Sequence, residues 1–297
     1  MLKIIRIGLY FIVLGMILVI FLSYQGIKHA TKRPRYTTEK IKEHEANRSI
    51  LLKEFNAQPL TFMTEDGLNL SGLLLVREGA QRTLLICHGY RMCKERLLPF
   101  ASMFPHDNIF LFDHRAHGQS DGSRVTIGYE EPQDVLAAAR VVQSHEKTKN
   151  LPLYGIGISM GAVSLLAAAC QEKIFSAIIL DSPFGKLDVQ ARRVFSYKFK
   201  LPFVPFEAIA HKIFEYCMQF SLGQVDSFSS IKDLTTPVMI IHSVFDSIAS
   251  LQEAYKIFET APCKKEMWIV HASRHAYIFS DCSEEYRQRV DEFFKTA

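Results

Sequence analysis

The sequence lacks the signatures of several large classes of protein. Its six cysteines include no C-x-x-C pair and no spacing typical of metal ligands, which argues against a zinc site and against an obligatory disulfide framework. Neither sign of charge prevails, because 35 basic residues face 31 acidic ones, and this balance gives no sign of binding to nucleic acid. The chain of 297 residues is 48% apolar, which supports a substantial core. We expect no metal and no organic cofactor.

One stretch near the N-terminus lacks charge altogether. Residues 7–23 carry no charged side chain, and at about 1.5 Å per residue such a helix reaches roughly 26 Å, marginally enough to cross a bilayer. No small-x-small cleavage site follows it, which disfavours a signal peptide. We therefore predict a single-pass membrane anchor over residues 1–27 and a charged helical stalk over 28–56. The orientation stays open, because the basic residues after the run and the short basic N-terminus favour opposite sides of the membrane.

Strand and helix patterns alternate over residues 57–297, and Asp66-Gly67 between the first two strand patterns is typical of a hairpin. This alternation predicts an α/β fold with a mostly parallel sheet, helices on both faces and an antiparallel hairpin at its start. The predicted strands are Leu60 to Met63, Leu68 to Val76, Thr83 to His88, Ile109 to Asp113, Leu153 to Ile156, Ala177 to Asp181, Val238 to His242 and Met267 to Val270. The predicted helices are Glu95 to Met103, Pro132 to Gln143, Ala162 to Cys170, Leu251 to Phe258 and Glu284 to Phe294.

Residues 183–236 break this alternation, because strand patterns lapse and prolines recur there. About fifty residues are too many for an ordinary loop. We predict a small helical cap over the C-terminal edge of the sheet, where ligands bind in such folds. Its aromatic residues either pack the cap onto the sheet or form a surface for an acyl chain or a membrane; they include Phe195, Tyr197, Phe199, Phe203 and Phe206.

The five residues Gly157-Ile158-Ser159-Met160-Gly161 carry the clearest chemical signal in the chain. They follow a short apolar strand pattern and precede a run of small apolar residues typical of a buried helix. This is the pattern of a nucleophile elbow, in which a serine lies on a sharp turn between a strand and a helix. The glycines leave room for that turn, and the helix begins at the nucleophile with its free N–H groups.

A serine nucleophile needs a base, and the base needs an acid that orients it. Asp246 and His275 follow late strands in the order serine, acid, histidine, so all three are predicted at one edge of the sheet. Asp181 also ends a strand and is the alternative acid. His271 is the alternative base, although it lies close to the strand end.

An oxyanion hole requires two backbone N–H donors. The N–H of Met160 follows the nucleophile directly, and the N–H of Tyr90 lies in the turn after the Thr83 to His88 strand. Gly89 allows that turn to be sharp, and the side chain of Tyr90 is expected to line the pocket. His88 and His242, at strand ends, are expected to be hydrogen-bonded in place rather than catalytic.

With these motifs together, the chain resembles the α/β-hydrolases, and more closely the membrane-anchored bacterial hydrolases of the serine aminopeptidase-like group. The resemblance covers residues 55–297. It is carried by Ile86 to Tyr90, Phe112 to Gly122, the elbow, Asp181-Ser182-Pro183, Ile240 to Asp246 and His275-Ala276. In the Phe112 to Gly122 stretch it implies a structural loop with Asp113 and Arg115 as anchors. Ala116 and Ala249-Ser250 depart from the family pattern without removing a catalytic group.

The resemblance and the motifs together predict a serine hydrolase that cleaves a carboxylic ester or thioester through an acyl-enzyme. Its expected partners are a small-molecule or lipid acyl substrate and, through residues 7–23, a membrane. Peptidase activity is less favoured, because no pocket for a free amine is recognisable. The alternatives are an acyltransferase with the same triad and a membrane-tethered binding module that has a hydrolase fold.

Overall fold

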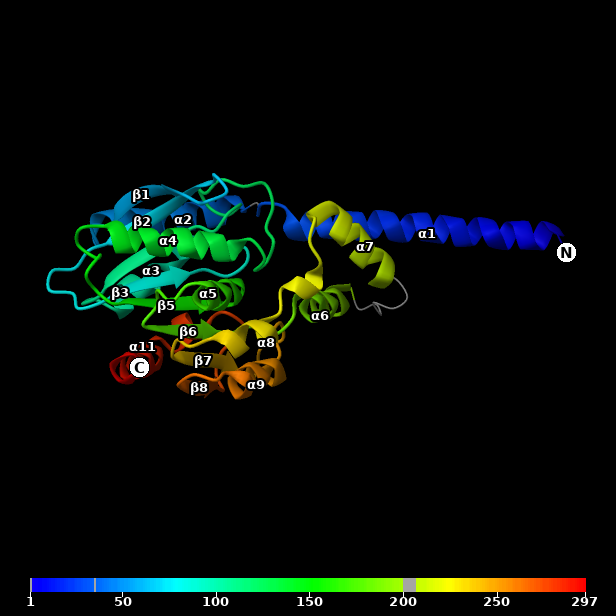
Figure 1. Ribbon diagram of the computed structural model, residues 1–297. Helices are drawn as coiled ribbons and strands as arrows, with labels where there is room; N and C mark the ends of the chain where they lie inside the picture. Colours follow the sequence, from blue (N-terminus) through cyan, green and yellow to red (C-terminus); the bar gives the residue numbers. More distant parts are fainter. Residues whose placement is uncertain (1, 35, 200–206) are drawn as a thin grey trace.

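The computed structural model describes residues 2–34, 36–199 and 207–297. Within these residues eight strands form one sheet in the order β1-β2-β4-β3-β5-β6-β7-β8, and β2 alone runs against the others (Figure 1). The predicted strands, the opening hairpin and the mostly parallel sheet are therefore confirmed. The strands are β1 (Gln58–Met63), β2 (Asn69–Leu75), β3 (Thr83–Cys87), β4 (Asn108–Phe112), β5 (Leu153–Ile158), β6 (Ala177–Asp181), β7 (Val238–Ser243) and β8 (Lys265–Val270).

Helices cover both faces of this sheet (Figure 1). The helix predicted from Glu95 is split into a 3-10 turn, η1, and a short helix, α3, which has Pro99 in its first turn. The helices of the body are α2 (Thr38–Lys53), η1 (Lys94–Leu97), α3 (Leu98–Met103), α4 (Glu131–Ser144), α5 (Met160–Gln171), α8 (Ser227–Ser230), η3 (Ile231–Asp233), α9 (Leu251–Thr260), α10 (Ile278–Asp281) and α11 (Ser283–Thr296).

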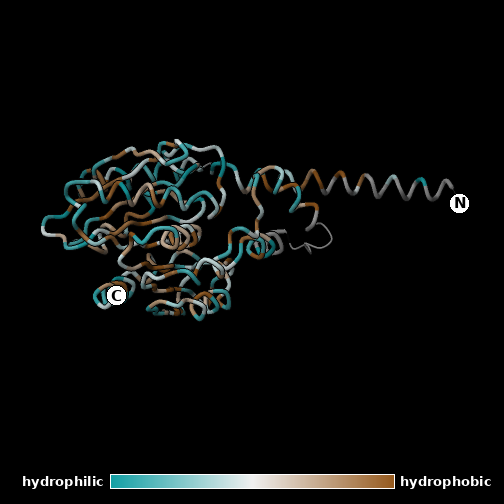
Figure 2. Tube along the Cα trace, viewed as in Figure 1, coloured by the Kyte–Doolittle hydropathy of each residue, from teal (hydrophilic) through white to brown (hydrophobic). Residues whose placement is uncertain are grey.

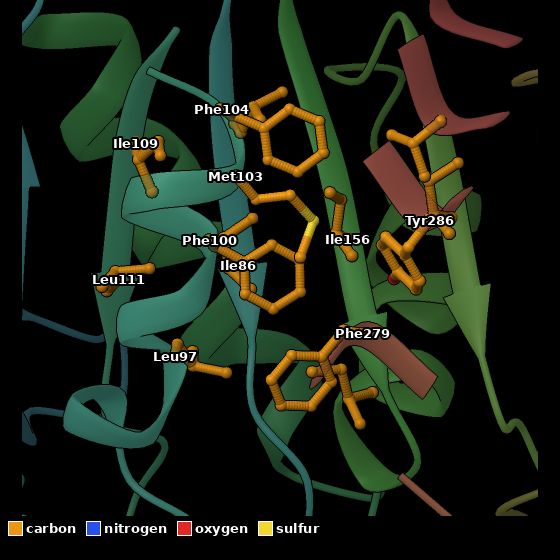
Figure 3. Packing of buried hydrophobic residues seen from close by; sticks show 14 of the residues in the cluster. Ile86, Leu97, Phe100, Met103, Phe104, Ile109, Leu111, Ile156, Phe279 and Tyr286 are labelled. Atoms are coloured by element: carbon orange, nitrogen blue, oxygen red, sulfur yellow. The ribbon is translucent and has the colours of Figure 1, made fainter. Parts of the chain in front are cut away.

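Two apolar cores lie on opposite faces of the sheet, because successive side chains of a strand point to opposite sides. Leu84 and Ile86 of β3 belong to one core, and Leu85 and Cys87 belong to the other. Figure 3 shows the first core, where aromatic residues of α3, α10 and α11 meet the strands. All residues of β3, β4, β6 and β7 are buried, as expected for strands covered on both faces.

The segment before the sheet forms two helices. The stretch predicted as a charged stalk contains α2, whose Leu51 is fully buried in the first core, so α2 packs on the body instead of standing away from it. The first helix, α1 (Leu2–Thr31), projects from the body, and α7 (Glu207–Met218) packs beside it (Figure 1). Among the residues whose side chains are described, no helix is long and apolar enough to cross a membrane. The anchor and the domain boundaries stay predictions.

The insertion between β6 and β7 is helical in its described part. Helices α6 (Leu187–Phe199) and α7 (Glu207–Met218) lie beyond the sheet edge at which α1 joins the body (Figure 1). A short turn, η2 (Leu222–Gln224), leads back to the sheet. Figure 2 shows apolar positions along the strands and on α1. Of the aromatic residues singled out in this insertion, those at positions 203 and 206 lie outside the described residues, and the side chains at 195, 197 and 199 are not among those described.

Candidate active site

Ser159 lies on a sharp turn between β5 and α5. Its backbone has a φ of 54° and a ψ of −113°, a conformation that residues with a side chain rarely adopt. The turn requires glycine on both sides, since a Cβ atom at Gly157 would lie 2.5 Å from the carbonyl oxygen of Gly161. A Cβ atom at Gly161 would lie 2.6 Å from the carbonyl oxygen of His88. The N–H of Ser159 donates to the carbonyl of Asp181 at 2.8 Å, which ties the turn to β6.

A chain of hydrogen bonds leads from this serine into the protein. The Oγ atom of Ser159 lies 2.8 Å from Nε2 of His275, and Nδ1 of His275 lies 2.7 Å from Oδ2 of Asp246. The N–H groups of Ile248 and Ala249 each donate to Oδ1 of Asp246 at 2.8 Å, which sets the orientation of the carboxylate. The Asp246 side chain is fully buried and that of His275 is 17% exposed. The structure thus brings together three side chains singled out from the sequence.

The surroundings of Asp246 favour its ionised form. Burial by itself would raise the pKa of this carboxyl group, but the hydrogen bond and charge of His275 and the N–H of Ala249 lower it below its ordinary value. An ionised Asp246 accepts the Nδ1 proton of His275, and this leaves Nε2 as the acceptor toward Ser159. In this tautomer the imidazole can take the hydroxyl proton of Ser159.

The alternative residues occupy different positions. Asp181 is fully buried at the end of β6, and burial raises its pKa to about 7. Its Oδ1 accepts the hydroxyl of Ser182 at 2.8 Å, and within the described residues no hydrogen bond joins it to His275. His271 is exposed after β8, and His242 is buried with Nε2 3.7 Å from Oδ2 of Asp246. Neither histidine reaches the serine.

Two backbone N–H groups were considered for an oxyanion hole, those of Tyr90 and Met160. Neither makes a hydrogen bond within the described part of the chain. Met160 is the first residue of α5, where N–H groups have no partner inside the helix. The loop after β3 lies against the serine, since a Cβ atom at Gly89 would lie 3.5 Å from Cβ of Ser159. The first turn of α5 and the loop that carries Tyr90 therefore both lie beside Ser159.

His88 orients the loop that carries Tyr90. Its Nε2 accepts the N–H of His114 at 3.0 Å, so its Nδ1 is the protonated nitrogen and donates to the carbonyl of Gly89 at 2.8 Å. The Gly89 carbonyl and the Tyr90 N–H belong to one planar trans peptide and point in opposite directions. The hydrogen bond from His88 therefore also sets the direction of the Tyr90 N–H. Burial lowers the pKa of His88 well below its ordinary value, which keeps it neutral.

Buried ion pairs hold the loop after β4. Asp113 accepts Nζ of Lys94 at 2.5 Å, and Arg115 donates to Asp134 from Nε and from its backbone N–H, both at 2.8 Å. Asp113 and Arg115 are thus anchors of the loop, as the resemblance implied. The fully buried Lys94 is a residue that the sequence pattern gives no signal for. It lies 19 residues from Asp113, in a segment without apolar periodicity.

A serine at such an elbow, on a sheet of this strand order with helices on both faces, is characteristic of the α/β-hydrolase fold. The chain therefore has the α/β-hydrolase fold, which it shares with a solved esterase structure. Residues 78–219 match the family model described as Serine aminopeptidase, S33. The predicted α/β-hydrolase fold is therefore confirmed, whereas membrane anchoring remains a prediction.

Three individual proteins illustrate the relationship. The chain is 28% identical over 233 residues to uncharacterized protein YqkD of Bacillus subtilis (strain 168). The matched region covers 76% of this chain and 75% of that protein. It is 24% identical over 204 residues to the monoglyceride lipase homolog of monkeypox virus, covering 56% of this chain and 71% of the relative. The structure of the Pyrococcus furiosus esterase Pf2001 superposes with a TM-score of 0.70 and 23% identity, over 90% of this chain and 98% of the esterase.

Proposed function

We propose that the chain is a membrane-anchored serine hydrolase that cleaves a carboxylic ester or thioester through an acyl-enzyme. In this proposal Ser159 is the nucleophile, His275 the general base and Asp246 the acid that orients it. The observation that carries the proposal is the continuous pair of hydrogen bonds from Ser159 through His275 to Asp246, at 2.8 and 2.7 Å, beside two unbonded backbone N–H groups.

The geometry supports a two-step mechanism. Nε2 of His275 takes the hydroxyl proton while Oγ of Ser159 bonds to the acyl carbon, and the ionised Asp246 stabilises the imidazolium. The N–H groups of Met160 and Tyr90 donate to the oxyanion of the tetrahedral intermediate. His275 then gives its proton to the departing alcohol or thiol, which leaves an acyl ester on Ser159. Water, deprotonated by the same imidazole, hydrolyses this ester and regenerates the serine.

The substrate class is inferred from relatives and from the chain itself. Pf2001 is an esterase and the monkeypox relative a monoglyceride lipase homolog, and both names refer to ester substrates. The anchor is supported by the uncharged run of residues 7–23 and by the course of α1, which joins the body beside the loop of Tyr90. An anchored enzyme with its reactive serine near that junction would meet amphiphilic acyl substrates at the membrane surface.

A fluorophosphonate probe tests the chemistry, since it labels only an activated serine. We expect the full-length chain to be labelled, and Ser159→Ala and His275→Ala to lose labelling while remaining folded. Ser280→Ala, which changes an exposed serine, is the matched control and should be labelled like the wild type. Absence of labelling in a folded wild type would refute the proposal and favour the binding-module alternative.

Substrate panels then separate the remaining classes. Acyl esters of increasing chain length, acyl thioesters and aminoacyl anilides distinguish esterase, thioesterase and aminopeptidase activity, and we expect turnover of the first two. Added alcohol that captures the acyl group in preference to water would identify an acyltransferase instead. Membrane fractionation of the full chain tests the anchor separately, because an anchored chain resists extraction at alkaline pH.

A further inference from the structure

The C-terminal end of α1 is capped by the body of the protein. The last four carbonyl groups of a helix have no partner inside the helix, so other groups must satisfy them. In α1 three of these four accept hydrogen bonds from residues of the body. Nη2 of Arg91 donates to the carbonyl of His29 at 3.2 Å, and Oη of Tyr90 donates to that of Ala30 at 2.7 Å. The N–H of Val125 donates to the carbonyl of Thr31 at 2.6 Å. The remaining carbonyl, that of Lys28, accepts the N–H of Lys32 at 3.1 Å.

Two of these donors are consecutive residues of the loop beside Ser159. The Oη atom of Tyr90 donates to Ala30 and accepts from Nε of Arg91 at 3.1 Å, and the guanidinium lies 5.3 Å from the centre of the Tyr90 ring. The N–H of Arg91 donates to Nε2 of His117 at 3.2 Å. The two side chains are thus held in a single arrangement between the helix end and the body.

This contact acts on the residue whose own N–H is a proposed oxyanion donor. Such a donor is effective only if it is held in position before the oxyanion forms. His88 holds one side of the loop through the Gly89 carbonyl, and the end of α1 holds the Tyr90 side chain. Burial also raises the pKa of Tyr90, so its phenol remains a proton donor. Without the Ala30 contact, the peptide that carries the Tyr90 N–H would be held only from the His88 side, and the N–H would be less firmly directed at the serine.

We propose that the C-terminal end of α1 is a positioning element of the oxyanion hole, and that the side chains of Tyr90 and Arg91 are the positioning residues that connect them. The inference rests on the proposed function, since it concerns the same site. It gives α1 a second role besides anchoring, because the segment that would leave the membrane is bonded directly to the catalytic loop. Catalysis therefore depends on the contact between the C-terminal end of α1 and the loop of Tyr90 and Arg91.

Tyr90→Phe in the full-length chain tests this, because it keeps the ring and removes only the hydroxyl. Loss of a complete oxyanion donor costs roughly 10²–10³ in kcat, so a donor that is only loosened should cost about tenfold. We expect a kcat about tenfold lower with KM within about twofold of the wild type. The affinity for a boronic acid, which mimics the tetrahedral intermediate, should fall by a similar factor. Tyr216→Phe, at an 81% exposed residue of α7, is the control and should change none of these.

The outcomes separate this inference from the proposed function. A wild type that is labelled and active, with Tyr90→Phe equal to it in kcat and in boronic acid affinity, overturns the inference alone. An unlabelled wild type overturns the proposed function first. If Tyr90→Phe fails to fold, Arg91→Gln provides the test, since it removes the contacts with His29 and Tyr90 from an exposed side chain. A selective loss of kcat in that variant supports the inference, and a wild-type kcat refutes it.

Discussion

Two buried carboxylates lie near His275, Asp181 at the end of β6 and Asp246 in the loop after β7, and replacing each with an amide distinguishes their roles. Asp246 accepts Nδ1 of His275 at 2.7 Å on one oxygen and two backbone N–H groups on the other. Asp181 accepts the hydroxyl of Ser182 at 2.8 Å. The sequence alone left both as possible acids. The comparison of Asp246→Asn with Asp181→Asn is therefore a matched test of the assignment.

The expected magnitude follows from the partners of Asp246. In Asp246→Asn the N–H groups of Ile248 and Ala249 keep the amide oxygen on their side, so the NH₂ group faces Nδ1 of His275. The imidazole must then accept at Nδ1 and carry its proton on Nε2, where it can no longer take the proton of Ser159. An equivalent change in a serine protease lowers kcat by roughly 10⁴, or about 5.5 kcal/mol of activation free energy. We expect a loss of about 10³–10⁴ here.

Asp181→Asn should have a much smaller effect on turnover. The pKa of Asp181 is raised to about 7, so a neutral amide resembles the protonated form that the wild type already populates at neutral pH. We expect kcat to change by less than about tenfold, far below the loss caused by removing a triad acid. The assay is hydrolysis of a short p-nitrophenyl ester, with thermal unfolding measured on each variant. If both variants are folded and Asp181→Asn is the more damaging, the assignment of Asp246 as the acid is wrong.

Two further predictions concern the surroundings of the site. Asp181, whose titratable neighbours are His275, Asp246 and Tyr286, has a pKa raised from 3.8 to about 7, so the folded state retains a proton that the unfolded chain loses. The free energy of unfolding should therefore fall between pH 4 and pH 7, by up to about 4 kcal/mol. Urea unfolding of Asp181→Asn should show that fall reduced, and parallel curves for the two proteins would contradict this. At the elbow, Gly161→Ala should cost about 1–3 kcal/mol of stability through overpacking and most of the activity, because its Cβ would overlap the carbonyl groups of Cys87 and His88. Gly223→Ala, with its nearest atom 4.0 Å away, should leave both nearly unchanged, and equal stability losses would refute the steric argument.

The strands and the order of the site residues could be predicted because their signals are local. A strand buried on both faces is a continuous apolar run, as β3 and β6 are. The carboxyl ends of parallel strands share one edge, so residues that follow β5, β7 and β8 were expected near each other. The elbow is defined by five consecutive residues. None of these inferences required knowledge of distant contacts.

The rest of the site depends on contacts that no local pattern marks. Lys94 and Asp113 are 19 residues apart, and Tyr90 and Ala30 are 60 apart. Each pair joins polar groups of loops or of a helix end, where apolar periodicity carries no information. The second neighbour of β2 could not be predicted either, since β2 pairs with β4 and not with β3. Such pairings can be identified only from the folded structure.

The two kinds of contact have different consequences for catalysis. Apolar packing and steric fit determine where Ser159 lies, because its turn is enclosed by β5, α5 and the backbone at Gly161. Polar contacts determine the direction of the groups proposed to act on the substrate: Asp246 orients His275, and His88 orients the peptide of Tyr90. A net hydrogen bond is worth only about 1 kcal/mol of stability, whereas a misdirected donor in the transition state costs roughly 3–4 kcal/mol. Substitutions at these polar contacts should therefore lower kcat well before they lower the melting temperature.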